Sequence, residues 1–165
     1  MRRLRRFLIV CLVSHLCALR AFPQTAGEPK REDNVYSMAL AASLDEMQKQ
    51  WGYQNNGIDY AHMLALKNPE ITDELSTEFG THHVEYLDQQ ALVQRCKKAA
   101  KQVPVLEIHS MHNDGARLRI QVSVSWASNY KRGLALGFSD WSDVEFQYDC
   151  EKKKFVISSV KLGGI

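Results

Sequence analysis

The strongest constraint in this chain is a strict alternation of apolar and polar residues from Ala116 to Trp126, written ARLRIQVSVSW. Apolar side chains occupy every second position, and arginine, glutamine and serine occupy the positions between them. Side chains of a strand point alternately to its two faces, so this segment predicts a β-strand with one buried and one solvated face. Such a strand is typical of an antiparallel sheet that covers a single core.

The segments around this strand predict the rest of an antiparallel sheet. VPVLEIHSMH (103–112) is expected to precede it as a strand, and Asn113-Asp114-Gly115 is expected to form the hairpin turn between them. A third strand is expected over GFSDWSDVEF (137–146) and a fourth over FVISSVKLGG (155–164). The C-terminal part of the chain is therefore predicted to be a run of long antiparallel strands.

Apolar residues recur at helical spacing in the N-terminal part. Leu40, Leu44, Met47 and Trp51 fall on one stripe, and Asn34 stands where a helix cap is expected. We expect a second helix from Ile58 to Lys67, because a proline follows shortly afterwards.

A third helix is expected over QQALVQRCKKAAKQ (89–102), with Asp88 as its capping residue. The segment before it, residues 71–88, is ambiguous. It favours two short strands around Phe79-Gly80-Thr81, and a helical turn at residues 72–75 is the competing interpretation.

The N-terminus carries the features of a secretion signal. A basic stretch, MRRLRRF, precedes an apolar run that is short for a membrane-spanning helix. We interpret residues 1–21 as a signal peptide, with an uncleaved anchor as the alternative, and residues 22–33 as a flexible leader. Residues 34–165 are expected to form a single domain, exported to the periplasm or the extracellular space, with no stable membrane insertion after cleavage.

The charge balance changes when this segment is removed. The whole chain has 21 basic and 19 acidic residues, but residues 1–21 contain five arginines and no acid, which leaves 16 basic against 19 acidic residues, a net charge of −3. A mildly acidic domain without a basic stripe is a poor candidate for binding a phosphate backbone. We therefore expect no nucleic-acid partner.

Cysteine usage follows the same division. Cys11 and Cys17 belong to the predicted signal, and Cys96 and Cys150 remain in the mature chain. Two cysteines in an exported chain favour a disulfide between them. The alternative is a buried Cys96 on a helix face and an unpaired Cys150 at a turn.

The order of elements, the helix led by Asp88 and the Asn113-Asp114-Gly115 hairpin resemble the nuclear transport factor 2-like superfamily, over roughly residues 34 to 162. This group includes SnoaL-like cyclases and ketosteroid isomerase-like proteins. The resemblance implies an α+β, cone-shaped fold with three N-terminal helices on a curved, mostly antiparallel sheet and a pocket at the open end. It also implies a homodimer through the outer face of the sheet, where Trp141 could act as an anchor. It carries over no catalytic motif.

The alternation in GFSDWSDVEF gives two pocket candidates. Without a bulge, Asp140 and Ser142 share the face of Val144 and would continue it toward a pocket. A carboxylate on an apolar wall can act as a general base, because burial raises its pKa. The alternative is that Asp140 only shapes the entry into the strand, with a bulge turning it outward.

The predicted second helix gives three more candidates, Asp59, Tyr60 and His62. Asp59 and His62 are three residues apart and could form an acid–base pair on one helix face, although such pairs are more often solvated surface. His82 and His83 resemble a metal site, but adjacent residues of a strand point to opposite faces. We expect no metal and no cofactor.

These observations favour an exported domain that binds a small, largely apolar ligand or a partner chain, without demonstrable catalysis. One alternative is an isomerase-, dehydratase- or cyclase-type enzyme that uses a pocket carboxylate as general base. The other is a protein-interaction module whose pocket is filled by its own side chains. One bulge reverses every face assignment that follows it, so the alternation does not decide among them.

Overall fold

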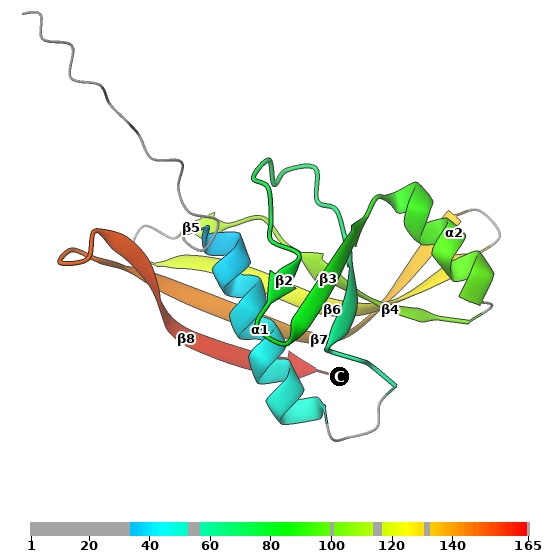
Figure 1. The fold of residues 1–165 in the computed structure, drawn as a ribbon, viewed down its shortest axis with the longest axis horizontal. Coiled ribbons are helices and arrows are strands. Elements are labelled where there is room, and N and C mark those ends of the chain that lie inside the picture. Colours follow the sequence, from blue (N-terminus) through cyan, green and yellow to red (C-terminus); the bar gives the residue numbers. More distant parts are fainter. Residues whose placement is uncertain (1–33, 53–56, 100, 114–116, 131–132, 165) are drawn as a thin grey trace, which may run out of the picture.

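The computed structural model describes residues 34–52, 57–99, 101–113, 117–130 and 133–164. The predicted signal, the leader and most of the hairpin turn at 113–115 lie outside these ranges. The described residues form two helices and eight strands (Figure 1). In chain order they are α1 (Val35–Trp51), β1 (His62–Leu66), β2 (Glu78–Phe79), β3 (His82–Leu87), α2 (Gln89–Ala99), β4 (Val103–Ile108), β5 (His112–Asn113), β6 (Leu118–Tyr130), β7 (Gly133–Asp149) and β8 (Lys154–Gly164).

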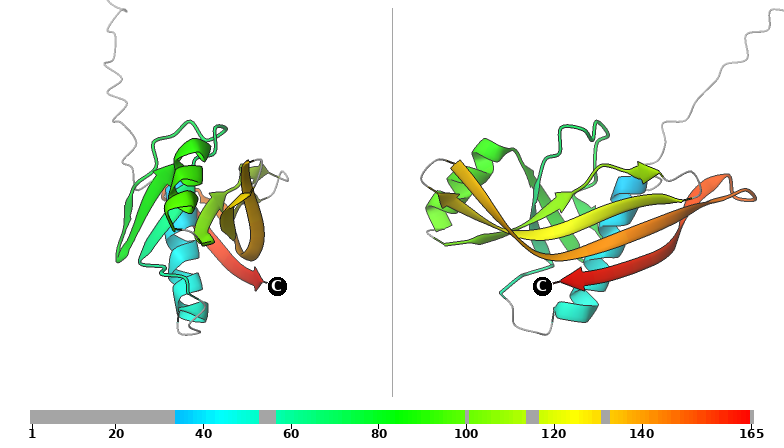
Figure 2. Two further views of the ribbon diagram at one scale, coloured as in Figure 1. Left: turned by 90° about the vertical axis from the view of Figure 1, so that its right-hand side faces the viewer. Right: turned by 180° about the vertical axis from the view of Figure 1, so that it is seen from behind.

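All these strands belong to one mixed sheet. Its order is β2-β3-β1-β4-β6-β7-β8, and β5 pairs with β6 beside this path. β1 lies between β3 and β4 and runs parallel to both, whereas all the other pairings are antiparallel. The long strands β6, β7 and β8 cross β1 and β3 at a steep angle, so the twisted sheet curves around α1 (Figure 2).

The two helices pack on opposite faces of β1 and β4. The larger core joins the buried stripe of α1 to Met63 and Ala65 of β1 and to Leu106 of β4. The smaller core joins α2 to Leu64 and Leu66 of β1. The central strands are therefore covered on both sides, as parallel strands usually are.

α1 forms where the sequence predicts it. The side chain of Asn34 accepts hydrogen bonds from the backbone N–H groups of Tyr36 and Ser37, which caps the helix. Leu40, Leu44 and Met47 are fully buried against the sheet. Within the described ranges, no helix has both the length and the apolar character that crossing a membrane would require.

The prediction of three N-terminal helices on the sheet is wrong. Residues 62–66 of the expected second helix form strand β1, and α2 is the second and last helix of the described chain. The sequence HMLAL shows no alternation because β1 is buried on both faces, and an apolar run without alternation also fits a helix. The strands around Phe79-Gly80-Thr81 are confirmed as β2 and β3, and the competing helical turn is not formed.

The apolar face predicted for β6 is confirmed, since Leu118, Ile120, Val122 and Val124 are all buried. The opposite face is not solvated throughout, because Ser123 and Ser125 are also buried. The pairing of β6 with β7 shifts at one point. Phe138 lies opposite Ser125 and Asp140 lies opposite Val124, so Ser139 is an extra residue that forms a β-bulge. Phe138 and Asp140 therefore point to opposite faces although they are two residues apart.

Candidate functional site

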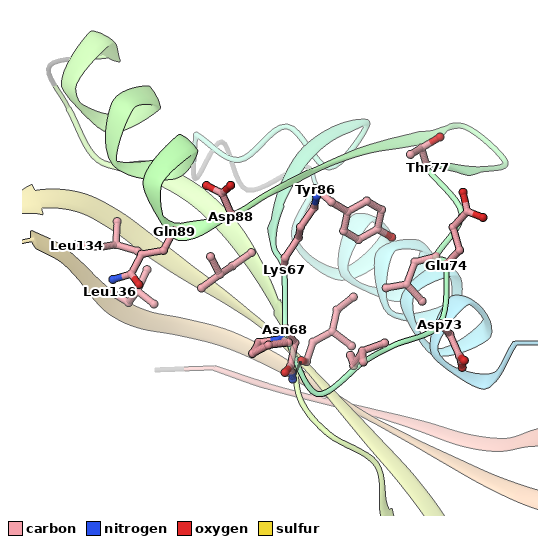
Figure 3. Close-up of a pocket in the computed structure, with 15 residues that line it drawn as sticks. Lys67, Asn68, Asp73, Glu74, Thr77, Tyr86, Asp88, Gln89, Leu134 and Leu136 are labelled. Atoms are coloured by element: carbon pink, nitrogen blue, oxygen red, sulfur yellow. Dashed lines mark hydrogen bonds between the residues drawn. The ribbon is translucent and has the colours of Figure 1, made fainter.

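A cavity of about 1020 Å³ lies at the carboxyl ends of the three parallel strands (Figure 3). The last residues of β1, β3 and β4 meet at this edge of the sheet, because all three strands run in the same direction. The N-terminus of α2, the loop of residues 67–77 and the first part of β7 complete the wall. The carboxyl edge of parallel strands is where α/β sheets commonly bind ligands.

Asn68 fixes the start of the loop that borders the cavity. Its side-chain Nδ2 donates to the carbonyl oxygen of Ile108 at 2.9 Å, which ties the end of β1 to the end of β4. Its Oδ1 accepts from the backbone N–H of Glu70 at 2.9 Å and so forms a tight turn around Pro69. The loop therefore leaves β1 in a defined direction.

Tyr86 fixes the other end of this loop. Its hydroxyl group donates to the carbonyl oxygen of Ser76 at 2.8 Å, and its ring lines the cavity. Burial raises the pKa of Tyr86 above its ordinary value, so the hydroxyl stays protonated and keeps this bond. Asn68 and Tyr86 together hold the loop over the cavity.

The cavity is acidic in its polar part. Its lining has one basic side chain, Lys67, and three carboxylates, Asp73, Glu74 and Asp88, within the part of the chain that the structure describes. Asp88 caps α2 as predicted, since its Oδ1 accepts from the backbone N–H of Ala91 at 2.7 Å. Neighbouring groups also engage Asp73 and Glu74, and Asp73 accepts from Nδ2 of Asn34 at 3.1 Å.

The two sides of the cavity differ in character. Leu134 and Leu136 of β7 lie on one side, below the start of α2, and Asp73, Glu74 and Thr77 lie on the loop at the other side (Figure 3). Leu66, Ile108 and other apolar residues line the space between them. This arrangement suits a molecule with an apolar body and a polar group at one end.

The structure places Asp140 and Ser142 away from this cavity. Both point to the face of Val144, as the sequence predicts, but α1 covers that face. The hydroxyl of Ser142 is fully buried and donates to Oγ of Ser43 on α1 at 2.6 Å. Asp140 is half-buried beside the bulge and accepts from Oγ of Ser139 at 2.8 Å. Ser142 thus joins the sheet to α1, and Ser139 and Asp140 bond to each other at the bulge.

Asp59, Tyr60 and His62 lie at the opposite end of β1 from the cavity. Asp59 and His62 do pair, with Oδ2 and Nδ1 3.1 Å apart, but both side chains are largely exposed and neither is on a helix. Tyr60 is buried in the larger core. The pair is a solvated contact at the entry to β1, and none of the three lines the cavity.

The expected disulfide is not formed in this structure. Cys96 is a buried free thiol on α2, and Cys150 is an exposed free thiol after β7. α2 and the turn between β7 and β8 lie at opposite ends of the molecule (Figure 1), so the two sulfurs cannot meet within one chain. Burial also raises the pKa of the Cys96 thiol, which makes it a poor nucleophile.

His82 and His83 point to opposite faces of β3, as the sequence predicts. The side chain of His82 is 4% exposed, and that of His83 is 49% exposed. The described residues contain no cluster of three or more groups that could hold a metal ion. The cavity therefore has no metal-binding set among the residues that are described.

Comparison of the chain with protein-family models, with curated proteins and with solved structures found no match. These comparisons therefore do not identify the nuclear transport factor 2-like superfamily, and the order of elements that suggested it is not the observed one, because the expected second helix contains strand β1.

Sequence reasoning missed the residues that form the cavity wall. Asn68 and Pro69 follow a strand that reads as a helix, and Leu134 and Leu136 lie in a segment that reads as a connection. Asp88 was identified as a helix cap but not as part of a site. The available signal was the capping aspartate directly after a short strand, because a strand followed at once by a helix places the helix N-terminus at the carboxyl edge of the sheet.

Proposed function

We propose that this protein binds a small, largely apolar molecule in the cavity at the carboxyl ends of β1, β3 and β4. The cavity itself is the observation that supports this proposal most directly. Its volume of about 1020 Å³ is at the upper end of ligand pockets, which measure roughly 300–1,000 Å³. Binding is proposed to take place after export, because residues 1–21 are interpreted as a signal peptide.

The charges of the cavity lining narrow the class of ligand that can bind. Three carboxylates and one lysine surround the cavity, so an anionic ligand would face net repulsion. A neutral molecule or an amine with an apolar body fits better. The apolar body would lie against Leu134 and Leu136, and the polar end would face the loop that carries Asp73 and Glu74.

Binding is favoured over catalysis because three polar groups of the cavity, Asp88, Tyr86 and Asn68, already have structural partners. Asp88 caps α2, Tyr86 holds the loop through Ser76, and Asn68 holds it through Ile108. A general acid–base pair needs two titratable groups that converge on one reacting atom. The open space also supports a ligand-binding protein over an interaction module with a self-filled pocket.

The test is a thermal-shift screen of small apolar alcohols, amines and acids, with a variant that fills the cavity. Gln89 lines the cavity and is exposed at the start of α2, so Gln89→Trp should place an indole ring in the ligand's space without disturbing the core. Gln90→Trp is the matched control, because Gln90 is the next residue of α2, is also exposed, and does not line the cavity.

We expect at least one compound to raise the melting temperature of the parent and of Gln90→Trp but not that of Gln89→Trp. A ligand present at 100 times its Kd stabilises the folded state by about 2.7 kcal/mol, which a melting curve resolves easily. Equal shifts for all three proteins would place binding elsewhere. No shift with any compound would contradict the proposal.

A further inference from the structure

Strand β7 has one segment that no strand covers on its outer side. β7 spans Gly133–Asp149, but β8 pairs only with residues 140–149 of it. Residues 133–139 therefore pair with β6 on one side and lie at the edge of the sheet on the other. Figure 2 shows β8 ending well before the β6–β7 hairpin. Alternate N–H and C=O groups of such an edge point away from the sheet.

The exposed edge has an unusual composition, GLALGFS. It contains no charged residue and no proline. Leu134, Leu136 and Phe138 alternate along it, and Leu136 and Phe138 are 39% and 48% exposed. The residues between them, Gly133, Ala135 and Gly137, are small. An apolar edge strand without charges readily pairs with another strand.

The two outermost strands of the sheet, β8 and β2, are protected. β8 carries Lys154 and Lys161, and a bulge at Ser158 interrupts its pairing with β7. At the opposite edge, β2 is only Glu78–Phe79. Lysines, bulges and short strands are the usual means by which soluble proteins prevent edge pairing. Residues 133–138 carry no lysine and no bulge, and the bulge at Ser139 lies only at the end of the segment, next to the residues that pair with β8.

We propose that residues 133–139 pair antiparallel with the same segment of a second copy of this chain, with the two-fold axis close to Leu136. In this register Leu134 of one copy faces Phe138 of the other, the two copies of Leu136 face each other, and Ala135 faces Gly137. Apolar side chains then meet apolar side chains on one face, and small residues meet on the other. The pairing joins the two sheets into one.

The segment's chemistry favours a second copy over a foreign peptide. An uncharged segment that places similar side chains opposite each other is complementary to itself, which is what a two-fold interface requires. A second copy is also present wherever the chain is present, so it can cover the edge at all times. Because the segment is short compared with an interface of roughly 800 Å² per partner, we expect a Kd in the micromolar range.

The first experiment measures mass in solution by light scattering at tens of micromolar protein, using the chain from residue 22 onward. All the contacts described above lie between Asn34 and Gly164, so this truncation removes none of them. We expect the parent to be a dimer and Leu136→Lys to be a monomer, with dimerisation weakened more than tenfold. Phe155→Lys is the matched control, because Phe155 is also 39% exposed but lies in the β7–β8 hairpin at the other end of the molecule.

A second experiment does not depend on a destabilising charge. In a Cys150→Ser background, Leu136→Cys would place two thiols next to each other across the axis. Opposed residues of antiparallel strands have Cα atoms about 4.5–5.5 Å apart, which is within the range of a disulfide. We expect mild oxidation to yield a covalent dimer of Leu136→Cys but not of Phe155→Cys. Cys96 is buried and should not contribute.

Three results would overturn the proposal. The parent could be a monomer at these concentrations, Leu136→Lys could remain a dimer, or Leu136→Cys could fail to cross-link. A dimer that is lost in Phe155→Lys but kept in Leu136→Lys would assign the interface to the exposed aromatic residues of the β7–β8 hairpin instead. All these measurements are made without ligand. Leu136 also lines the cavity, so a loss of ligand binding in Leu136→Lys would not count as evidence for the interface.

Discussion

Replacing His82 with alanine should destabilise the protein far more than replacing its neighbour, His83. The ring of His82 lies between β3 and α1, with Nδ1 2.9 Å from the carbonyl oxygen of Tyr60 and Nε2 3.0 Å from Oδ1 of Asp45. His83 lies on the other face of β3, where its Nδ1 is 2.6 Å from Oε1 of Glu78. Replacing each histidine in turn therefore compares the loss of a buried ring with the loss of a solvated ring on the same strand.

The magnitude follows from what each partner loses. The carbonyl of Tyr60 belongs to a residue that is 1% exposed, so it would lose a buried hydrogen bond, which costs about 1–3 kcal/mol. The missing ring also leaves a void, so we expect a total of about 3 kcal/mol for His82→Ala. The side chain of Asp45 is 62% exposed and can bond to water once the ring is gone, so the loss of this contact adds little to the cost of His82→Ala. Asp45→Ala leaves Nε2 of the His82 ring, whose side chain is 4% exposed, without its partner and should cost about 1–2 kcal/mol. His83→Ala should stay within about 0.5 kcal/mol of the parent.

Urea unfolding followed by circular dichroism measures these differences, because the free energy of unfolding is the product of the midpoint and the slope. His82→Asn adds a specific check, since the asparagine amide can still donate to the Tyr60 carbonyl and should recover about 1 kcal/mol. The reasoning fails if His82→Ala and His83→Ala have the same midpoint. It also fails if Asp45→Ala costs as much as His82→Ala, since the contact with Asp45 would then be the main contribution.

Two further predictions concern the thiols and the bulged end of β7. In the native chain from residue 22 onward, a thiol reagent at pH 8 should modify Cys150 within minutes and Cys96 only after unfolding. The reason is that Cys96 is buried and the pKa of its thiol is raised. Equal rates, or a disulfide in the oxidised protein, would contradict this prediction. Gly163→Ala should cost about 1–3 kcal/mol in the same unfolding assay, since the added methyl group would overlap the ring of Trp141. Gly137→Ala has room for a Cβ and should cost less than about 1 kcal/mol. Similar values for both variants would contradict the close packing of Trp141 on Gly163.

Local patterns predicted most of the elements correctly. The stripe of α1 and the alternation of β6 each place apolar residues on a single face, so the period of the pattern identifies the element. β1 was misread for a physical reason. Its residues Met63 to Leu66 contact cores on both faces, so every position is apolar and the period disappears. Leucine, methionine and alanine then favour a helix by intrinsic propensity, and the tertiary contacts override that preference.

The candidate site could be predicted only in part. The sequence correctly placed Asp140 and Ser142 on one face, because this relation is local. It did not show that α1 covers that face. Asp59 and His62 do pair, but at the entry to β1 and not on the predicted helix face. The cavity depends on contacts between distant segments, such as that of Asn68 with Ile108, 40 residues away. No pattern of neighbouring residues encodes a contact between segments so far apart in the sequence.

The sequence by itself therefore determined the first helix, the long antiparallel strands and the capping residue of α2, because each depends on side-chain spacing within a few residues. The tertiary structure decided which strands are parallel, which face each helix covers and where an open cavity remains. Those features depend on strand order and on a single extra residue at Ser139, which reverses the face of the residues before it. Burial, and with it the chemistry of each side chain, is decided only when these long-range pairings form.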